Sequence, residues 1–153
     1  MLQRIQTVYF LMAFIFVSTS LIGNTLFTYT FNEIEFYVTA YGIENSLKPT
    51  IDSKIYYLPI LTISLLLLSI IFSFKNRKRQ ISLSWLALVL NLVTGSWIVY
   101  SCISVTMCSN CNSTNPVPSV WFYLFQSAFI FILLGILGVR KDKKMVDSLN
   151  RLR

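Results

Sequence analysis

Three cysteines are the side chains in this chain most able to do chemistry. Cys108 and Cys111 form a C-x-x-C pair in a short polar segment, and Cys102 precedes them. On the oxidising side of a membrane this spacing is typical of a thiol–disulfide oxidoreductase, which needs a thiolate of low pKa and usually a second cysteine pair that relays electrons. The sequence holds no second pair. A local disulfide or two unpaired small residues is the simpler interpretation, and thiol–disulfide exchange stays the alternative function.

The residue types of the sequence do not indicate a metal site or a cofactor site. The chain has no His, and two thiolates are too few to complete a tetrahedral metal site. We therefore predict no catalytic residue, no metal and no cofactor. Transporters usually hold an ionisable group at membrane depth, and the apolar segments described below contain none. A small-molecule transporter therefore ranks third, and a mid-membrane cavity lined by Asn91 and Gln126 would support it.

The composition indicates a membrane protein. Of 153 residues, 55% are hydrophobic and 12% are charged, which is about half of the charged share in a soluble domain. A spanning helix needs about 20 apolar residues, and four such stretches occur, at about 7–26, 55–74, 81–102 and 117–139. We predict an all-α membrane protein of one domain (1–153), a bundle of four transmembrane helices. The first stretch is interpreted as an uncleaved span, with a cleaved signal peptide as the alternative.

Small and amide side chains recur within these stretches at helical spacing. Gly95 and Gly135 would let neighbouring helices approach closely, and the amides of Asn91 and Gln126 can form hydrogen bonds across a helix interface. We interpret these four residues as helix-packing positions.

Basic residues lie mostly on one side of the predicted bundle. Eleven of the 13 Lys and Arg residues come before the first stretch, between the second and third, or after the fourth. Positive residues mark the cytoplasmic side, so both termini are predicted to be cytoplasmic. The basic residues flank the spans and do not alternate with aromatics on one face. The net charge of +7 therefore indicates orientation, and we predict no nucleic-acid partner.

The predicted outer loop, residues 27–54, alternates bulky and polar side chains. Phe27, Tyr29 and Phe31 are separated by threonines, and the alternation resumes after Asn32–Glu33. This period of two predicts strands joined by a turn at Asn32–Glu33. We expect a small extracytoplasmic β-hairpin. Because an isolated hairpin is only marginally stable, its apolar face should lie on the outer ends of the helices or against a partner; the same aromatics would also suit an interfacial belt.

A basic tail, residues 140–153, follows the fourth stretch. Met145, Leu149 and Leu152 fall at i, i+4 and i+7, so a helical tail would carry one apolar stripe among basic residues. Such a helix is expected to lie on the inner membrane surface, where anionic lipid contributes about 1 kcal/mol per basic residue, or to dock into a partner. A solvated tail is the alternative.

Three segments together resemble a known family. They are the start Met1–Thr7, the connection Phe74–Ile81 and the ending Arg140–Arg153. All three are similar to segments of an uncharacterised family, a domain of unknown function, of small four-span inner-membrane proteins from Bacteroidota. The segments lie at the start, middle and end, so the resemblance covers essentially the whole chain. It implies a multi-pass protein of the bacterial inner membrane with no assigned activity, and it supplies no catalytic residues.

The three resembling segments are all predicted to be cytoplasmic, and they hold polar residues that topology alone does not require. We expect these residues to meet beneath the bundle as one interaction face, which either joins the helices or receives a partner. The face comprises Gln3, Arg4, Gln6, Asn76, Arg77, Gln80, Asp142, Arg151 and Arg153. The favoured function is a non-enzymatic accessory or assembly subunit of an envelope complex, whose partners are the lipid bilayer and other membrane proteins.

Overall fold

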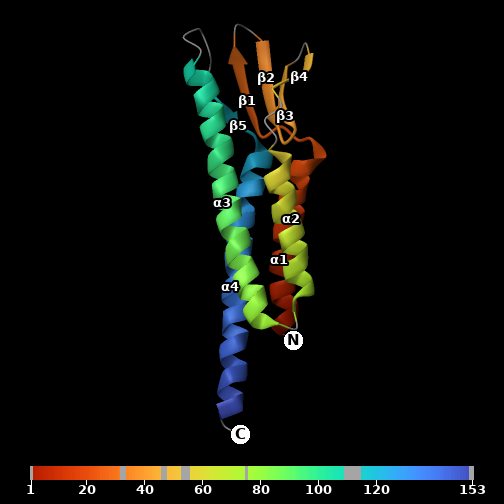
Figure 1. Ribbon diagram of the computed structural model, residues 1–153, viewed down its shortest axis with the longest axis vertical. Coiled ribbons are helices and arrows are strands. Elements are labelled where there is room, and N and C mark those ends of the chain that lie inside the picture. The colour runs from red at the N-terminus through yellow and green to blue at the C-terminus, as the bar shows by residue number, and fades with distance from the viewer. Residues whose placement is uncertain are drawn as a thin grey trace.

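The computed structural model shows four helices and a small sheet (Figure 1). It describes residues 2–31, 34–45, 48–52, 56–74, 76–108 and 115–151. The helices are α1 (Leu2–Thr19), α2 (Tyr57–Phe72), α3 (Arg77–Cys108) and α4 (Val120–Arg151). Each helix packs against two neighbours in the ring order α1, α2, α3, α4, and successive helices run in opposite directions. The predicted set of four helices is confirmed.

Three of these helices are long and apolar enough to cross a membrane. Their apolar segments are Ile5–Ile22, Arg77–Ser104 and Val120–Met145. α2 has 16 residues, which corresponds to about 24 Å of helix, whereas the hydrocarbon core of a bilayer is roughly 30 Å thick. By length the structure therefore supports three spans where four were predicted, and α2 packs beside them between α1 and α3.

The first helix ends earlier than the predicted span 7–26 because of its capping residues. A short 3-10 turn (Ser20–Ile22) follows α1 and stops at Gly23, whose φ of 86° is the left-handed conformation common after helices. The Asn24 side-chain amide donates a hydrogen bond to the Thr19 carbonyl at 2.7 Å. This bond satisfies one of the carbonyls that a helix end leaves open, so the chain leaves the helix before the apolar stretch is complete.

The last two helices extend beyond their predicted spans, 81–102 and 117–139. Each contains 32 residues, or about 48 Å of helix. α4 begins at Val120 because the two residues from Val117 to Pro118 form a strand. At its other end α4 continues unbroken to Arg151 and projects past the N-terminal end of α1 (Figure 1). The basic tail therefore continues the axis of α4 as a helix.

The interior of the bundle consists of apolar side chains that recur every three or four positions. The fully buried members include Phe10, Ala13 and Val17 on α1, Ile60, Ile63, Leu67 and Ile70 on α2, Ala87 and Ile98 on α3, and Phe125, Ala128 and Ile132 on α4. This spacing places them on one face of each helix, so the four faces together form a continuous core.

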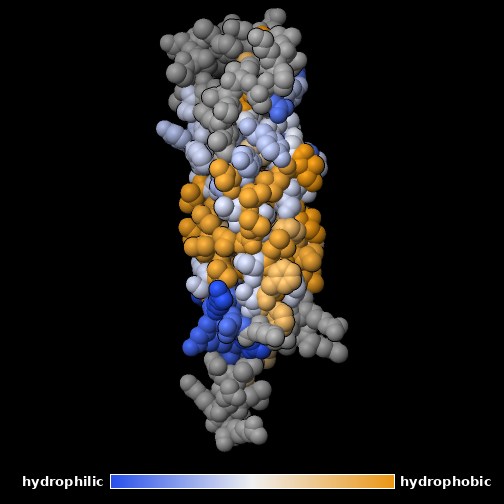
Figure 2. All heavy atoms as spheres, turned by 45° about the vertical axis from the view of Figure 1, so that its right-hand side comes forward, coloured by the Kyte–Doolittle hydropathy of each residue, from blue (hydrophilic) through white to orange (hydrophobic). Residues whose placement is uncertain are grey.

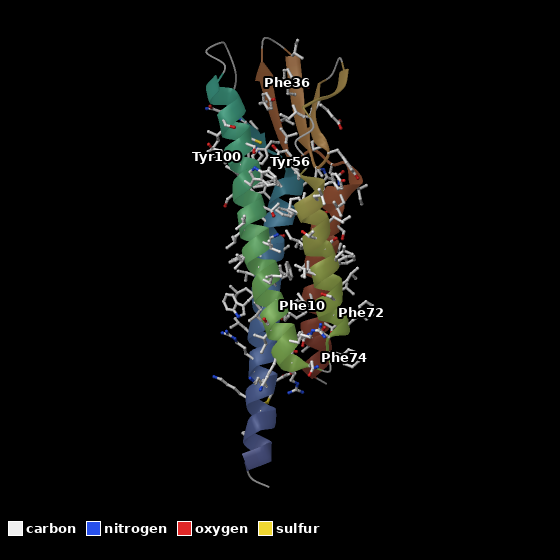
Figure 3. The ribbon with its side chains drawn as sticks, in the orientation of Figure 1. Phe10, Phe36, Tyr56, Phe72, Phe74 and Tyr100 are labelled. Carbon is white, nitrogen blue, oxygen red and sulfur yellow. The ribbon has the colours of Figure 1, made fainter. Side chains whose placement is uncertain are left out.

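The outside of the bundle is also apolar. Figure 2 shows a belt of hydrophobic side chains around the middle of the molecule, with hydrophilic residues beyond it at the lower end. Phe72 is 75% exposed and Tyr100 is 72% exposed, and both point away from the bundle, whereas Phe10 points into it (Figure 3). Soluble domains rarely expose an apolar surface of this extent, which is typical of a lipid-facing surface.

The sheet is larger than the predicted hairpin. β1 (Phe27–Phe31) and β2 (Ile34–Thr39) form the predicted antiparallel pair. β3 (Gly42–Asn45), β4 (Lys48–Asp52) and β5 (Val117–Pro118) extend the sheet to five strands, in the order β4-β3-β2-β1-β5. The prediction of a single hairpin was therefore incomplete, because three further strands belong to the same sheet. Glycine, asparagine and proline interrupt the alternation in β3 and β4, and β5 comes from a distant part of the sequence.

The sheet is attached to the ends of the helices through both backbone and side chains. The Leu26 N–H donates to the Val38 carbonyl at 2.6 Å, and the Leu26 carbonyl accepts from the Ser119 N–H at 2.9 Å. The ring of Phe27 lies 4.6 Å from that of Phe122 at the start of α4. Because Leu26 and Val38 are buried at this junction, the sheet rests on the helix ends, as expected for the apolar face of the predicted hairpin.

Candidate functional site at the basic end of the bundle

The end of the bundle opposite the sheet, here called the basic end, centres on the carboxylate of Asp142. Asp142 lies on α4 and is 6% exposed. The side-chain amide of Gln6 on α1 donates a hydrogen bond to its Oδ2, and the guanidinium of Arg77 on α3 donates to its backbone carbonyl at 3.0 Å. One residue of α4 thus connects to α1 and to α3 at the point where the apolar belt ends.

A small residue beneath Gln6 makes this contact possible. A Cβ added to Gly138 would lie 2.8 Å from Cγ of Gln6, which is too close for a packed pair of carbons. One level deeper, a Cβ on Gly135 would lie 2.6 Å from Cζ of Phe10. Positions 135, 138 and 142 share one face of α4 at spacings of three and four, so two glycines let α1 approach and the carboxylate then binds its amide.

Gln80 and Asn76 fix the turn between α2 and α3. The Asn76 N–H donates to the Ser73 carbonyl at 3.1 Å. The Asn76 carbonyl accepts a hydrogen bond from the Gln80 N–H at 2.9 Å, and this bond forms the first turn of α3. The buried Gln80 side chain donates from Nε2 to the Ile70 carbonyl at 3.4 Å. Because the last carbonyls of a helix lack intrahelical partners, this amide both closes the end of α2 and positions the start of α3.

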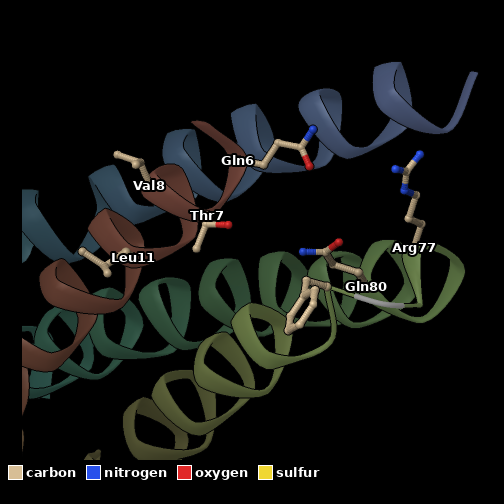
Figure 4. Close-up of a pocket in the computed structure, with 7 residues that line it drawn as sticks. Gln6, Thr7, Val8, Leu11, Arg77 and Gln80 are labelled. Carbon is tan, nitrogen blue, oxygen red and sulfur yellow. The ribbon is translucent and has the colours of Figure 1, made fainter. Parts of the chain in front are cut away.

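A cavity of about 330 Å³ opens between these elements (Figure 4). Its polar wall holds the amides of Gln6 and Gln80, which face each other across the space, and the side chain of Arg77. Its other lining residues are Thr7, Val8, Leu11 and Phe74. Three of these are apolar and largely exposed. The cavity therefore has a polar inner wall and an apolar rim, and in chemical terms it offers hydrogen bonding and one cation.

The structure brings together five of the nine residues predicted to form the interaction face. Gln6, Arg77, Gln80 and Asp142 are in or beside the polar network, and Asn76 is exposed at the adjoining turn. Gln3, Arg4 and Arg151 lie on described helices, but their side chains are outside the described part, as is Arg153 altogether. Gly138 was not among the nine residues predicted for this face, although its spacing to Gly135 and Asp142 places it there.

Two of the predicted helix-packing residues, Gly95 and Gln126, meet between α3 and α4, away from this end, whereas Gly135 contacts Phe10 of α1. A Cβ on Gly95 of α3 would lie 2.6 Å from Oε1 of Gln126 on α4, so these two residues are in direct contact. Asn91 is fully buried, and neither atom of its side-chain amide has a hydrogen-bond partner among the described residues. Oε1 of Gln126 likewise has no partner among them. The α3–α4 interface thus contains polar groups whose burial is unfavourable.

Replacing Asn91 with leucine is expected to stabilise the bundle. A buried amide without partners costs about 1–3 kcal/mol, and leucine has a similar shape without the polar atoms. We expect Asn91→Leu to raise the free energy of unfolding of the detergent-purified protein by about 1 kcal/mol or more. Reversible unfolding followed by circular dichroism measures the change. A less stable variant would mean that the Asn91 amide is hydrogen-bonded in the folded protein.

The cysteine hypothesis falls mostly outside the described residues. Cys102 is buried in α3, the side chain of Cys108 at the end of that helix is not described, and Cys111 lies in the undescribed segment 109–114. Within the described part of the chain, no three His, Cys, Asp or Glu residues group closely enough to hold a metal ion.

A smaller cavity of about 200 Å³ lies on the sheet, where Glu35 and Tyr37 of β2 share one face. The Tyr37 hydroxyl donates a hydrogen bond to the Glu35 carboxylate. This bond, helped by the negative charge of Glu35, raises the pKa of Tyr37 above its ordinary value. The tyrosine hydroxyl therefore serves as a hydrogen-bond donor to the carboxylate at neutral pH.

Three membrane-length helices, an exposed apolar belt and a polar network at one end define an integral membrane protein. The chain belongs to the family described as Domain of unknown function (DUF4293), whose model matches residues 2–152. This match over nearly the whole chain confirms the resemblance to a domain of unknown function. No curated protein and no solved structure matches the chain.

Proposed function

We propose that this chain is a non-enzymatic accessory or assembly subunit of a larger complex in a bacterial inner membrane. The feature that carries the proposal is α4, which continues as one helix to Arg151 and projects beyond the bundle (Figure 1). The point at which α4 leaves the bundle, here called its base, is held to α1 and α3 through Asp142. A projecting helix with a fixed base offers a protein surface in a defined direction.

We further propose that all four helices cross the membrane, with both termini cytoplasmic. α2 is short, but it lies between two longer helices, and its outer face shows Leu58, Leu61 and Leu65 in the apolar belt. A short span is accommodated at a modest cost by local thinning of the bilayer. The basic residues at the ends of α2, α3 and α4 then fall on the cytoplasmic side, as the positive-inside rule requires.

A photocrosslinking amino acid at Ser148 tests the subunit proposal. Ser148 is exposed on the projecting part of α4. In growing cells, we expect it to give a discrete protein adduct on illumination, which mass spectrometry then identifies. The same probe at Val89, which is 52% exposed in the apolar belt, is the matched control and should give mainly lipid adducts. The absence of a protein adduct at 148, with the chain expressed at its native level, would overturn the proposal.

The same cells separate the subunit from the thiol–disulfide alternative. A variant with Cys108→Ser and Cys111→Ser should keep the adduct at position 148 unchanged, because a subunit needs contact and no thiolate. Loss of the adduct together with a change in the redox state of other envelope proteins would instead favour the oxidoreductase.

A further inference from the structure

A second surface at the basic end has the chemistry of a lipid-headgroup site. A groove of about 700 Å³ runs between the start of α3 and the later part of α4. Its lining residues are Ile81, Leu137, Arg140, Lys141, Lys143 and Lys144. Four of these six side chains are basic and none is acidic. The groove is separate from the Gln6–Gln80 cavity, with which it shares no lining residue.

The placement of Asp142 keeps its carboxylate out of the groove. Asp142 is the only acidic residue between 140 and 146, and it lies in sequence between two lysines of the groove. Its carboxylate turns away to the amide of Gln6 and is buried there. Among the described side chains, the contact that joins α1 to α4 thus keeps the Asp142 carboxylate out of the groove lining, which holds four cations.

Aromatic and apolar side chains give the groove an orientation. The guanidinium of Arg140 lies over the ring of Trp85, 5.3 Å from its centroid, which holds this cation in place at the edge of the groove. Trp85 is 43% exposed and Leu137 is 53% exposed, and both face outward on the side of the apolar belt. A ligand that bound here would meet fixed positive charge at one end and lipid-facing side chains at the other.

We infer that this groove binds the phosphate headgroup of an anionic phospholipid from the adjacent leaflet. Basic pockets between membrane helices at this depth suit such headgroups. A free phosphate would use the cations alone, whereas a lipid would also contact Ile81 and Leu137 with the start of its acyl chains. The inference goes beyond the proposed subunit function and does not depend on any protein partner or on which side of the membrane the basic end faces.

Lipid binding to the full-length, detergent-purified protein tests the inference. Native mass spectrometry during titration with phosphatidylglycerol or phosphatidylcholine gives the affinity for each lipid. We expect phosphatidylglycerol to be retained and phosphatidylcholine to be lost at low activation energy. The double variant R140Q/K144Q should bind phosphatidylglycerol about thirty-fold more weakly, from about a five-fold loss for each basic residue.

Matched variants separate a site from diffuse attraction. K78Q/R79Q removes two exposed charges at the same end of the bundle, outside the groove lining, and should weaken binding less than about three-fold. Equal losses in both double variants would overturn the inference, as would equal binding of the two lipids. Leu137→Trp fills the groove without changing charge, so it should also lose phosphatidylglycerol, and it remains informative if R140Q/K144Q fails to fold. Displacement of the lipid by glycerol phosphate at equal concentration would assign the groove to a soluble phosphate and overturn the lipid assignment.

Discussion

Gly135→Ala is expected to lower the free energy of unfolding of the bundle by about 3 kcal/mol. The added Cβ would lie 2.6 Å from Cζ and 2.7 Å from Cε1 of Phe10, whose ring is fully buried and cannot rotate away. Helix propensity alone would make the alanine variant more stable by about 1 kcal/mol. A loss of stability would therefore show that the close contact with Phe10 outweighs helix propensity. Reversible unfolding in mixed detergent micelles, followed by circular dichroism, measures it.

Two companion variants show whether the loss arises at the α1–α4 contact. Ile130→Ala changes a residue of α4 that is 57% exposed, and it should alter stability little. Phe10→Leu combined with Gly135→Ala should recover part of the loss, because the smaller side chain makes room for the methyl group. If Gly135→Ala proved as stable as the wild type, α1 and α4 would have to lie farther apart than the structure places them.

Asp142→Lys is expected to destabilise the protein by at least about 3 kcal/mol. The change puts an ammonium group where a buried carboxylate accepts the Gln6 amide. The N–H of the Gln6 side-chain amide then points at an ammonium group, and it loses the carboxylate that accepts its hydrogen bond in the wild type. Arg77 still reaches the backbone carbonyl at this position, but it adds a further positive charge. The same unfolding measurement applies.

Asp142→Asn is the matched control, because the asparagine carbonyl can accept the same hydrogen bond in nearly the same volume. It should cost about 1 kcal/mol or less. Lys141→Glu changes charge by the same amount on an exposed neighbour and should be nearly neutral. Similar stability of Asp142→Lys and Asp142→Asn would show that the carboxylate is not buried against α1.

The helical part of the fold could be predicted because its cause is local. An uncharged apolar run must satisfy its own backbone in lipid, and a helix does so. The helix ends were harder to predict, since they depend on single contacts: Gly23 and Asn24 end α1 within an apolar run. A helical tail was predicted, but its unbroken continuation of α4 could not be, because a basic segment such as 140–151 has the same composition whether it continues a helix or leaves it.

The sheet could be predicted only in part, because one of its strands depends on a pairing between distant segments. The alternation around Tyr29 and Phe36 predicts β1 and β2, and those rings stack at 5.2 Å across the pair. β5 pairs with β1 through Val117 and Pro118. A two-residue strand has no periodicity from which it could be predicted, and its pairing depends on where α4 begins.

The candidate site was predicted as a set of residues more completely than as a geometry. The amides and arginines near the predicted cytoplasmic ends of the helices predict one shared face, and the structure brings Gln6, Arg77 and Asp142 into contact. Which residue contacts which could not be predicted, because Gln6 and Asp142 are 136 positions apart. Only the packing of α1 on α4 over Gly138 brings them together.

The contact between Gln6 and Asp142 can be tested in intact membranes by cysteine crosslinking. Gln6→Cys and Asp142→Cys are introduced into a chain whose three native cysteines have been replaced, with a protease site placed between residues 109 and 114. A short bis-maleimide should join the two positions, so the halves stay linked after cleavage. The halves should separate when Asp142→Cys is combined instead with Val8→Cys, because Val8 is 55% exposed on α1. Efficient linkage of the first pair alone is the predicted result. Equal linkage of both pairs, or of neither, would contradict the placement of α1 against α4 at the basic end.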